Sequence, residues 1–182
     1  MGIKGLGKFL KSIEIEIERE MIPKGATLVI DGNGWLFYLL KSIKNLEYGG
    51  GYDELREAVH TEVFYLQTLL ELKLFVYFDG ERTKLKDETQ KQRKIEIEEK
   101  WLKLYHHCTS KTGQPLSVFD MPKPIFAKNQ LVTALEELGI QTVTSSFEAD
   151  QDMAIFCYRK NQQGSPCYIY GEDRWVLLRV HP

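Results

Sequence analysis

The chain has 182 residues, of which 27% are charged, and its formal net charge is −2 at pH 7. This length suits one domain with a buried core, and the near-neutral balance gives no global basic signal for nucleic acid, although carboxylates would mask a local basic stripe in the sum. No apolar run is long enough to span a membrane, and no secretory leader pattern opens the chain. The three cysteines (Cys108, Cys157 and Cys167) lack metal-like spacing and predict an intracellular, reducing compartment.

Short apolar runs alternate with longer stretches of helical periodicity along the chain. In order, we expect a basic-faced helix (Gly2–Leu10), a strand or continued helix (Ile13–Glu20), a strand (Ala26–Ile30), a helix (Trp35–Ile43), a helix (Tyr52–Leu72), a strand (Lys73–Phe78), a charged helix (Thr83–Tyr105), a loop (Cys108–Leu116), a helix (Ile125–Leu138), a strand (Ile140–Val143), a helix (Gln151–Tyr158) and a strand (Cys167–Tyr170). Because strands and helices alternate, the sequence predicts an α/β fold with a mainly parallel sheet and helices on both faces.

Acidic residues follow each of the four expected strands. They are Asp31, Asp79, the pair Glu148 and Asp150, and Asp173. In a parallel sheet these strand ends share one edge, so we expect the five carboxylates to converge. Carboxylates held together repel one another, and hard divalent cations such as Mg²⁺ or Mn²⁺ supply the opposing charge. Two such ions about 4 Å apart suit phosphodiester hydrolysis.

Each of these acids also has an ordinary structural interpretation. Gly32, Asn33 and Gly34 are expected to form a turn after Asp31, and an acid before a helix caps its free N–H groups. A zinc site using His106-His107-Cys108 with the other two cysteines is disfavoured by the absence of a C-x-x-C pair. A phosphatase with an Asp31 nucleophile is disfavoured because Asn33 stands where a second acid is wanted.

Basic residues crowd the first half of the charged helix that follows Asp79. Lys86 and Arg93 are seven residues apart, on one helical face. One interpretation is a solvated helix with ion pairs between successive turns. The other is a basic helix that contacts the phosphates of a substrate near the carboxylates.

Five short motifs, in order, resemble the flap endonuclease/XPG family of structure-specific nucleases: M-G-I-K-G-L at the start, V-I-D-G, Y-F-D-G, S-F-E-A-D-Q-D and Y-G-E-D. The stretch Tyr48–Asp53 makes the resemblance closer to the asteroid branch. The resemblance implies an XPG-type, PIN-like three-layer fold and a site for two Mg²⁺ or Mn²⁺ ions. It also implies cleavage of DNA at single-strand/duplex junctions or overhangs, a role in DNA repair, a nuclear location and a monomer.

The resemblance also assigns roles to individual residues. Asp31, Asp79, Glu148, Asp150 and Asp173 match the family's metal-binding carboxylates. Lys86 and Arg93 match a catalytic basic pair that contacts the nucleic acid, and Gly2 matches an N-terminal residue that approaches the substrate. Phe37 falls where a family aromatic stacks on a base, although a core aromatic is the ordinary interpretation of such a residue.

Two departures from the family pattern affect these expectations. The fourth motif lacks its second acid, because Trp175 or Arg174 stands at that position, and the chain stops at Pro182. We therefore expect a truncated or alternatively spliced product, with an unpaired sheet edge after the last strand. One structural domain is expected, made of an N-terminal region (1–105), a linker (106–124) and a shortened internal region (125–182). A non-catalytic PIN-like scaffold that binds nucleic acid or protein is the alternative function.

Overall fold

The computed structural model describes residues 22–43, 50–81, 87–110, 116–117, 120–171 and 178–179. Its elements are β1 (Thr27–Asp31), α2 (Gly32–Leu40), α3 (Tyr52–Phe64), the π-helical segment η2 (Tyr65–Leu69), β2 (Lys73–Phe78), α4 (Asp87–Ser110), α5 (Ala127–Glu137), β3 (Gln141–Thr144), α6 (Ala149–Gln162), β4 (Cys167–Tyr170) and β5 (Leu178–Arg179). The expectations for Gly2–Leu10 and Ile13–Glu20 lie outside the described residues.

The centre of the fold is one five-stranded sheet in the order β3-β2-β1-β4-β5. The pairs β1–β2, β1–β4 and β2–β3 are parallel, and Asp31 lies beside Tyr77 at the end of its strand. β1 and β2 occupy the middle of the sheet, where both faces are covered, which is why their sequences are continuous apolar runs. The expected α/β fold with a mainly parallel sheet is confirmed.

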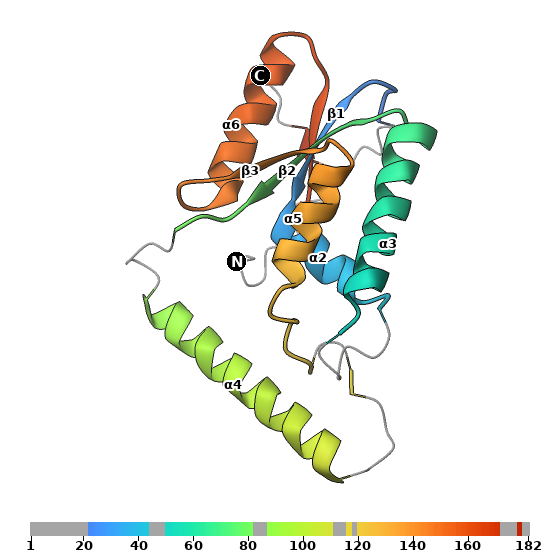
Figure 1. Ribbon diagram of the computed structural model, residues 1–182. Coiled ribbons are helices and arrows are strands. Elements are labelled where there is room, and N and C mark those ends of the chain that lie inside the picture. Colours follow the sequence, from blue (N-terminus) through green and yellow to red (C-terminus); the bar gives the residue numbers. More distant parts are fainter. Residues whose placement is uncertain are drawn as a thin grey trace, which may run out of the picture.

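Helices cover both faces of the sheet, so the molecule has three layers (Figure 1). On one face Leu28, Ile30 and Val76 pack in a core that includes residues of α2, α3 and α5. On the other face Val29 and Tyr77 pack against α6 in a smaller core. The alternation of successive strand residues between two cores places the ends of β1 and β2 between helices of both layers.

Several helix bounds differ from the expected ones. Gly32, Asn33 and Gly34 form the first turn of α2 and not a separate turn. The reason is that Asp31, the last residue of β1, is also the N-cap of the helix. The helix expected over Tyr52–Leu72 changes to π-helical geometry at Tyr65. α4 continues through Cys108 to Ser110, into the expected loop, and α6 begins at Ala149.

The outer edge of β4 was expected to lack a partner. The structure instead pairs Tyr168 and Ile169 with Arg179 and Leu178 of β5, which runs antiparallel. The two-residue strand covers that part of the edge. No helix in the described part of the chain combines the length and the apolar character that crossing a membrane requires.

Candidate functional site

Asp31 ends β1 and begins α2. Its carboxylate accepts a hydrogen bond of 2.9 Å from the backbone N–H of Asn33, so it is the N-cap of the helix. Gly32 directly follows, and a Cβ there would lie 2.4 Å from the ring of Phe78. Only glycine therefore allows the chain to turn from strand to helix this close to β2, and the turn places Asp31 at the carboxyl edge of the sheet.

Asp79 directly follows β2 and joins the starts of two helices. Its Oδ1 accepts a 2.9 Å hydrogen bond from the backbone N–H of Ala149, the first residue of α6. Its Oδ2 accepts a 3.0 Å hydrogen bond from the side-chain amide of Asn33, in the first turn of α2. The Asp79 carboxylate thus lies between helices that belong to opposite layers, and it helps to fix both.

The loops after β2 and β3 are joined backbone to backbone. Gly80 N–H donates to Phe147 O at 2.7 Å, and Glu81 N–H donates to Ser146 O at 3.0 Å. A Cβ on Gly80 would lie only 1.7 Å from the carbonyl oxygen of Ser145, so this close approach requires glycine. The joined loops bring the acids at the start of α6 next to Asp79.

Glu148 and Asp150 are both exposed at the N-terminus of α6. Glu148 is the N-cap residue, but its side chain makes no capping hydrogen bond. The backbone N–H at the start of the helix is instead bound by Asp79. Asp31 therefore caps α2, as the ordinary structural interpretation predicts. The start of α6 is bound by Asp79, from the end of β2, and not by the Glu148 carboxylate.

The charges of three of these acids interact. Burial raises the pKa of Asp31 above its ordinary value, and the charges of Asp79 and Asp150 raise that pKa further. Backbone hydrogen bonds from Asn33 and Gly34 oppose the rise. An edge of the sheet at which carboxylates repel one another attracts cations.

The chemistry of this donor set, all carboxylate oxygen, fits a hard divalent cation such as Mg²⁺. The geometry is less complete. In the part of the chain that the structure describes, no group of three His, Cys, Asp or Glu side chains converges closely enough to hold a metal ion. Asp173, the fifth expected ligand, lies outside the described residues.

Of the other expected site residues, Phe37 and Arg93 lie within the described part of the chain. Phe37 is half-buried on α2, with the ammonium groups of Lys41 and Lys123 5.1 and 5.4 Å from its ring centroid. Its ring lines a separate cleft, between α2 and α4, that also includes Trp101. Arg93 is exposed on α4, and Gly2 and Lys86 lie outside the described residues.

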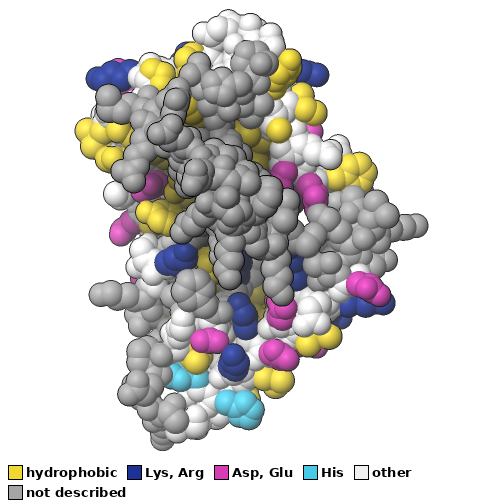
Figure 2. Space-filling view, turned by 180° about the vertical axis from the view of Figure 1, so that it is seen from behind, with side chains coloured by type: hydrophobic (Ala, Val, Ile, Leu, Met, Phe, Trp, Pro, Cys, Tyr) yellow, Lys and Arg dark blue, Asp and Glu magenta, His cyan; other side chains and the backbone are white. Residues whose placement is uncertain are grey.

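α4 has a mixed charge pattern in the half that was expected to be basic and beyond it. Figure 2 shows basic, acidic and apolar side chains interspersed over the lower part of the molecule, where α4 lies. Lys91, Arg93 and Lys94 are followed on the same helix by Glu96, Glu98 and Glu99. The described part of the helix therefore presents a short basic stretch near its start and not a basic face along its length.

Two residues at the site were not singled out by the sequence. Asn33 was noted only as the absence of an acid, yet it binds the Asp79 carboxylate. Lys128, on α5, donates to the backbone oxygen of Asp79 at 3.4 Å. The sequence D-G-N-G predicts a turn at Asn33 but does not indicate that its side chain binds Asp79. Nothing local marked Lys128, because its proximity depends on the packing of α5.

Comparison with known proteins agrees with the motifs. The XPG N-terminal domain family matches residues 1–100. The constitutive coactivator of peroxisome proliferator-activated receptor gamma from Bos taurus is 29% identical over 98% of this chain and 26% of its own length. Protein asteroid from Drosophila melanogaster is 27% identical over 97% of this chain and 19% of its own length. The chain thus spans about a quarter or less of these relatives.

Two solved structures of the catalytic core of Rad2 in complex with DNA substrate show weaker likeness. One is 18% identical, with a TM-score of 0.38, over 77% of this chain and 38% of the Rad2 chain. The other is 15% identical, with a TM-score of 0.42, over 80% of this chain and 44% of the Rad2 chain. These scores are too low for the likeness to support an inference.

Proposed function

The chain belongs to the XPG N-terminal domain family, and from that premise we propose that it is the nuclease module of a metal-dependent, structure-specific DNA endonuclease. The observation that supports the proposal is the raised pKa of Asp31 at the carboxyl edge of the sheet, to which burial and, after it, the charges of Asp79 and Asp150 contribute. Family membership and this acidic edge together favour phosphodiester hydrolysis at single-strand/duplex junctions or overhangs.

In this proposal Asp31, Asp79, Glu148 and Asp150 hold two Mg²⁺ or Mn²⁺ ions, with Asp173 as a further ligand. When bound, such ions supply positive charge that polarises the phosphodiester and lowers the pKa of an attacking water. Asn33 orients the Asp79 carboxylate through its 3.0 Å hydrogen bond. The backbone that carries the exposed acids of α6 is hydrogen-bonded to Asp79 and to the residues that follow it.

Substrate contacts are assigned to residues outside the acidic edge. Lys86 and Arg93 are proposed to bind the phosphate at the cleavage position, a role that suits their positive charge. Phe37 is proposed to stack on a base with Gly2 nearby. Lys41 and Lys123, which lie over the Phe37 ring, add positive charge to that contact.

The activity of the whole protein is part of the proposal, because the chain covers only 26% and 19% of the two curated relatives. We propose a nuclear location and a role in DNA repair. The relative named as a receptor coactivator is consistent with the nucleus. We also propose that the protein is a monomer and that residues 1–105, 106–124 and 125–182 are regions of one structural domain.

A non-catalytic scaffold that binds nucleic acid or protein is the second candidate function. Two observations favour it. In the residues that the structure describes, the acids do not form a three-ligand metal site. One relative is named for coactivation and not for nuclease activity. In this case the acidic edge keeps its structural role at the starts of α2 and α6 without catalysis.

Cleavage of end-labelled flap, overhang and single-stranded DNA in Mg²⁺ or Mn²⁺ separates the two candidates. We expect the wild-type chain to cut at least one of these substrates. Asp31→Ala should lower the rate at least ~100-fold, because it removes an essential part of the charge set. Glu57→Ala, which removes an exposed acid of α3, is the matched control and should leave the rate unchanged. A folded wild-type chain that cuts none of them would favour the scaffold.

A further inference from the structure

An open cleft of about 620 Å³ lies directly beside Asp79. It is lined by the residues that follow β2, by the residues that follow β3, and by Lys128 of α5. The hydrogen bonds of Gly80 and Glu81 to the loop after β3 form part of its structure, so its shape is fixed by backbone and not only by side chains. A ligand in this cleft would lie next to the acidic edge.

Lys128 brings a positive charge into this cleft. Its ammonium group donates to the backbone oxygen of Asp79 at 3.4 Å and lies 5.1 Å from the ring centroid of Phe78. Among the ion pairs of the described residues, none includes Lys128. A carbonyl and an aromatic face position this cation without neutralising it, so it is available to an anionic ligand.

Ser145 also lines the cleft. Its backbone N–H donates to Phe78 O at 2.9 Å, and its hydroxyl is closed off from solvent. Ser145 therefore helps to fix the wall of the cleft, and the Lys128 ammonium is the group that fits an oxyanion.

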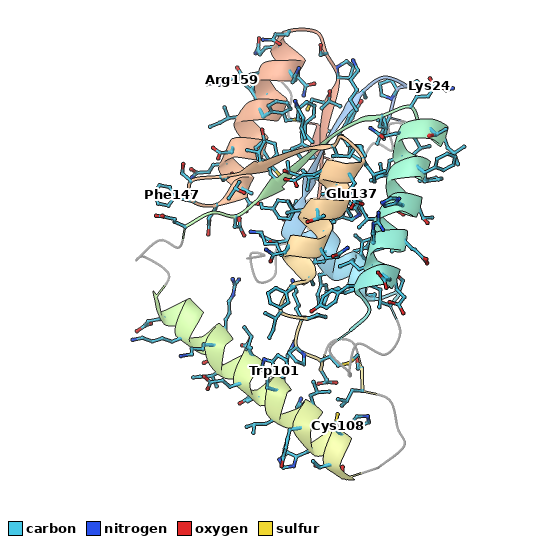
Figure 3. The ribbon with its side chains drawn as sticks, in the orientation of Figure 1. Lys24, Trp101, Cys108, Glu137, Phe147 and Arg159 are labelled. Atoms are coloured by element: carbon cyan, nitrogen blue, oxygen red, sulfur yellow. The ribbon has the colours of Figure 1, made fainter. Side chains whose placement is uncertain are left out.

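Phe147 stands at the rim of the cleft on the loop between β3 and α6. Its side chain points away from the sheet (Figure 3), and 56% of the residue surface is exposed. The backbone of Phe147 is held in place, because Phe147 O accepts the 2.7 Å hydrogen bond from Gly80 N–H. A rigidly mounted, exposed ring is a stacking surface, and it costs little ordering entropy when it is covered.

A phosphate group and a planar base occur together in a nucleotide, and the cleft offers a partner for each. We propose that Lys128 and Phe147 form a nucleotide subsite beside the acidic edge, in which Lys128 binds a backbone phosphate and Phe147 stacks on the base of an unpaired DNA strand. The choice of DNA rests on the proposed nuclease function. The stacked base must be unpaired, because one ring face on an open rim matches a base that is not held in a duplex.

DNA binding tests the subsite without requiring cleavage. Fluorescence anisotropy with labelled single-stranded oligothymidine, in Ca²⁺ in place of Mg²⁺, gives Kd between about 50 and 200 mM salt. Phe147→Ala should weaken binding about 5- to 150-fold through lost stacking. Lys128→Met should weaken it and lower the slope of log K against log salt by about 0.7, the value for one phosphate contact on a single strand.

Two matched variants keep the experiment specific. Phe64→Ala removes an aromatic residue of similar exposure, 59%, from α3. Lys24→Met removes a lysine whose partner is Glu71, before β1 and away from the cleft. Both should bind as the wild type does. Circular dichroism of all four variants checks that each is folded.

The outcomes distinguish the subsite from the nuclease proposal. Unchanged Kd and unchanged salt slope in both Lys128→Met and Phe147→Ala would overturn the subsite, even if the wild type cleaves DNA. Wild-type binding that both variants weaken would support it, even if no substrate is cut and the nuclease proposal fails. A wild-type chain that binds only a peptide library, and no oligonucleotide, would overturn it as well.

Discussion

Asp31 has two roles that affect stability in opposite directions. As the N-cap of α2 it contributes about 1 kcal/mol, the usual value for such a hydrogen bond. As a buried carboxylate near Asp79 and Asp150 it is costly in its ionised form, which is why its pKa is raised. An asparagine can keep the capping oxygen while removing the charge. The two effects are therefore separable by one substitution.

Asp31→Asn should raise the melting temperature, measured in EDTA at neutral pH. In a separate assay with Mg²⁺, the same substitution should abolish any cleavage. The folded-state pKa of Asp31 lies above its ordinary value of 3.8, so ionisation destabilises the folded wild type as pH rises through that pKa. The variant has no such loss. Thermal denaturation from acid to neutral pH should show a gap that is near zero in acid and widens as pH rises. Glu57→Gln should show no such gap, and an Asp31→Asn variant less stable at neutral pH would contradict the prediction.

At the scale of single elements, Asn161 ties α6 to the start of β4. Its side-chain oxygen accepts from Cys167 N–H at 2.8 Å, and its amide donates to Cys167 O at 3.2 Å. The Cys157 thiol also donates to Cys167 O, at 2.9 Å. The hydrogen bond between the two thiol groups and, next, burial raise the pKa of the Cys167 thiol, and both cysteines are buried core residues. β4 is thereby fixed at the end of the sheet remote from the acidic edge.

Asn161→Ala should lower the free energy of unfolding by about 1–3 kcal/mol, because it leaves the Cys167 N–H without its side-chain acceptor and removes one of the two side-chain donors to Cys167 O. Urea denaturation measures the change. Asn161→Asp keeps an acceptor for the Cys167 N–H, so its free energy of unfolding should fall between those of the wild type and Asn161→Ala. Gln162→Ala, the next residue, removes only an exposed bond to Tyr158 and should have little effect. Equal stabilities for the Asn161 and Gln162 variants would show that the tie contributes nothing.

The elements that the sequence predicted well are those with a local cause. The bounds of β2 and β4 agree with the expectation because each is an apolar run of strand length. The start of α2 was misplaced because glycines usually mark turns, whereas here Gly32 is required by the ring of Phe78. The change to π-helix at Tyr65 and the antiparallel β5 have no periodic signature.

At the scale of the molecule, the two cores share the strands of one sheet. Successive residues of β1 alternate between them, with Leu28 and Ile30 in the larger core and Val29 in the smaller. Neither core can lose its packing without disturbing strands that support the other. The expected behaviour is one cooperative transition and not two.

Met153→Ala, in the smaller core, should therefore lower the unfolding midpoint that Trp35 fluorescence reports from the larger core, measured with Trp101 and Trp175 replaced by phenylalanine. The expected loss is about 2–5 kcal/mol, as for other buried truncations, and Leu131→Ala in the larger core should cost a similar amount. Far-ultraviolet circular dichroism should give the same midpoints. Ile155→Ala, at an exposed position of α6, is the control. A Trp35 midpoint that Met153→Ala leaves unchanged would show that the layers unfold separately.

The prediction that Asp31, Asp79 and Asp150 lie at one edge of the sheet rests on one rule about parallel strand ends, and the charges of Asp79 and Asp150 contribute to the raised pKa of Asp31. The hydrogen-bond partners of each acid could not be predicted from the sequence, because they depend on contacts between residues far apart in the chain. Asp79 binds Ala149, 70 positions away, and Lys128 reaches Asp79 from 49 positions away. Such distances in the chain are beyond any local pattern.

The double attachment of Asp79 has a consequence for how the site would change over evolutionary time. Its carboxylate joins the starts of α2 and α6, so selection for folding alone retains an acid there. Asp150 has only the modest favourable interaction of an acid with a helix N-terminus. A lineage that gave up catalysis would keep Asp79 and let Asp150 drift. The residue at position 150, and not the residue at position 79, therefore indicates whether a related protein has kept catalysis.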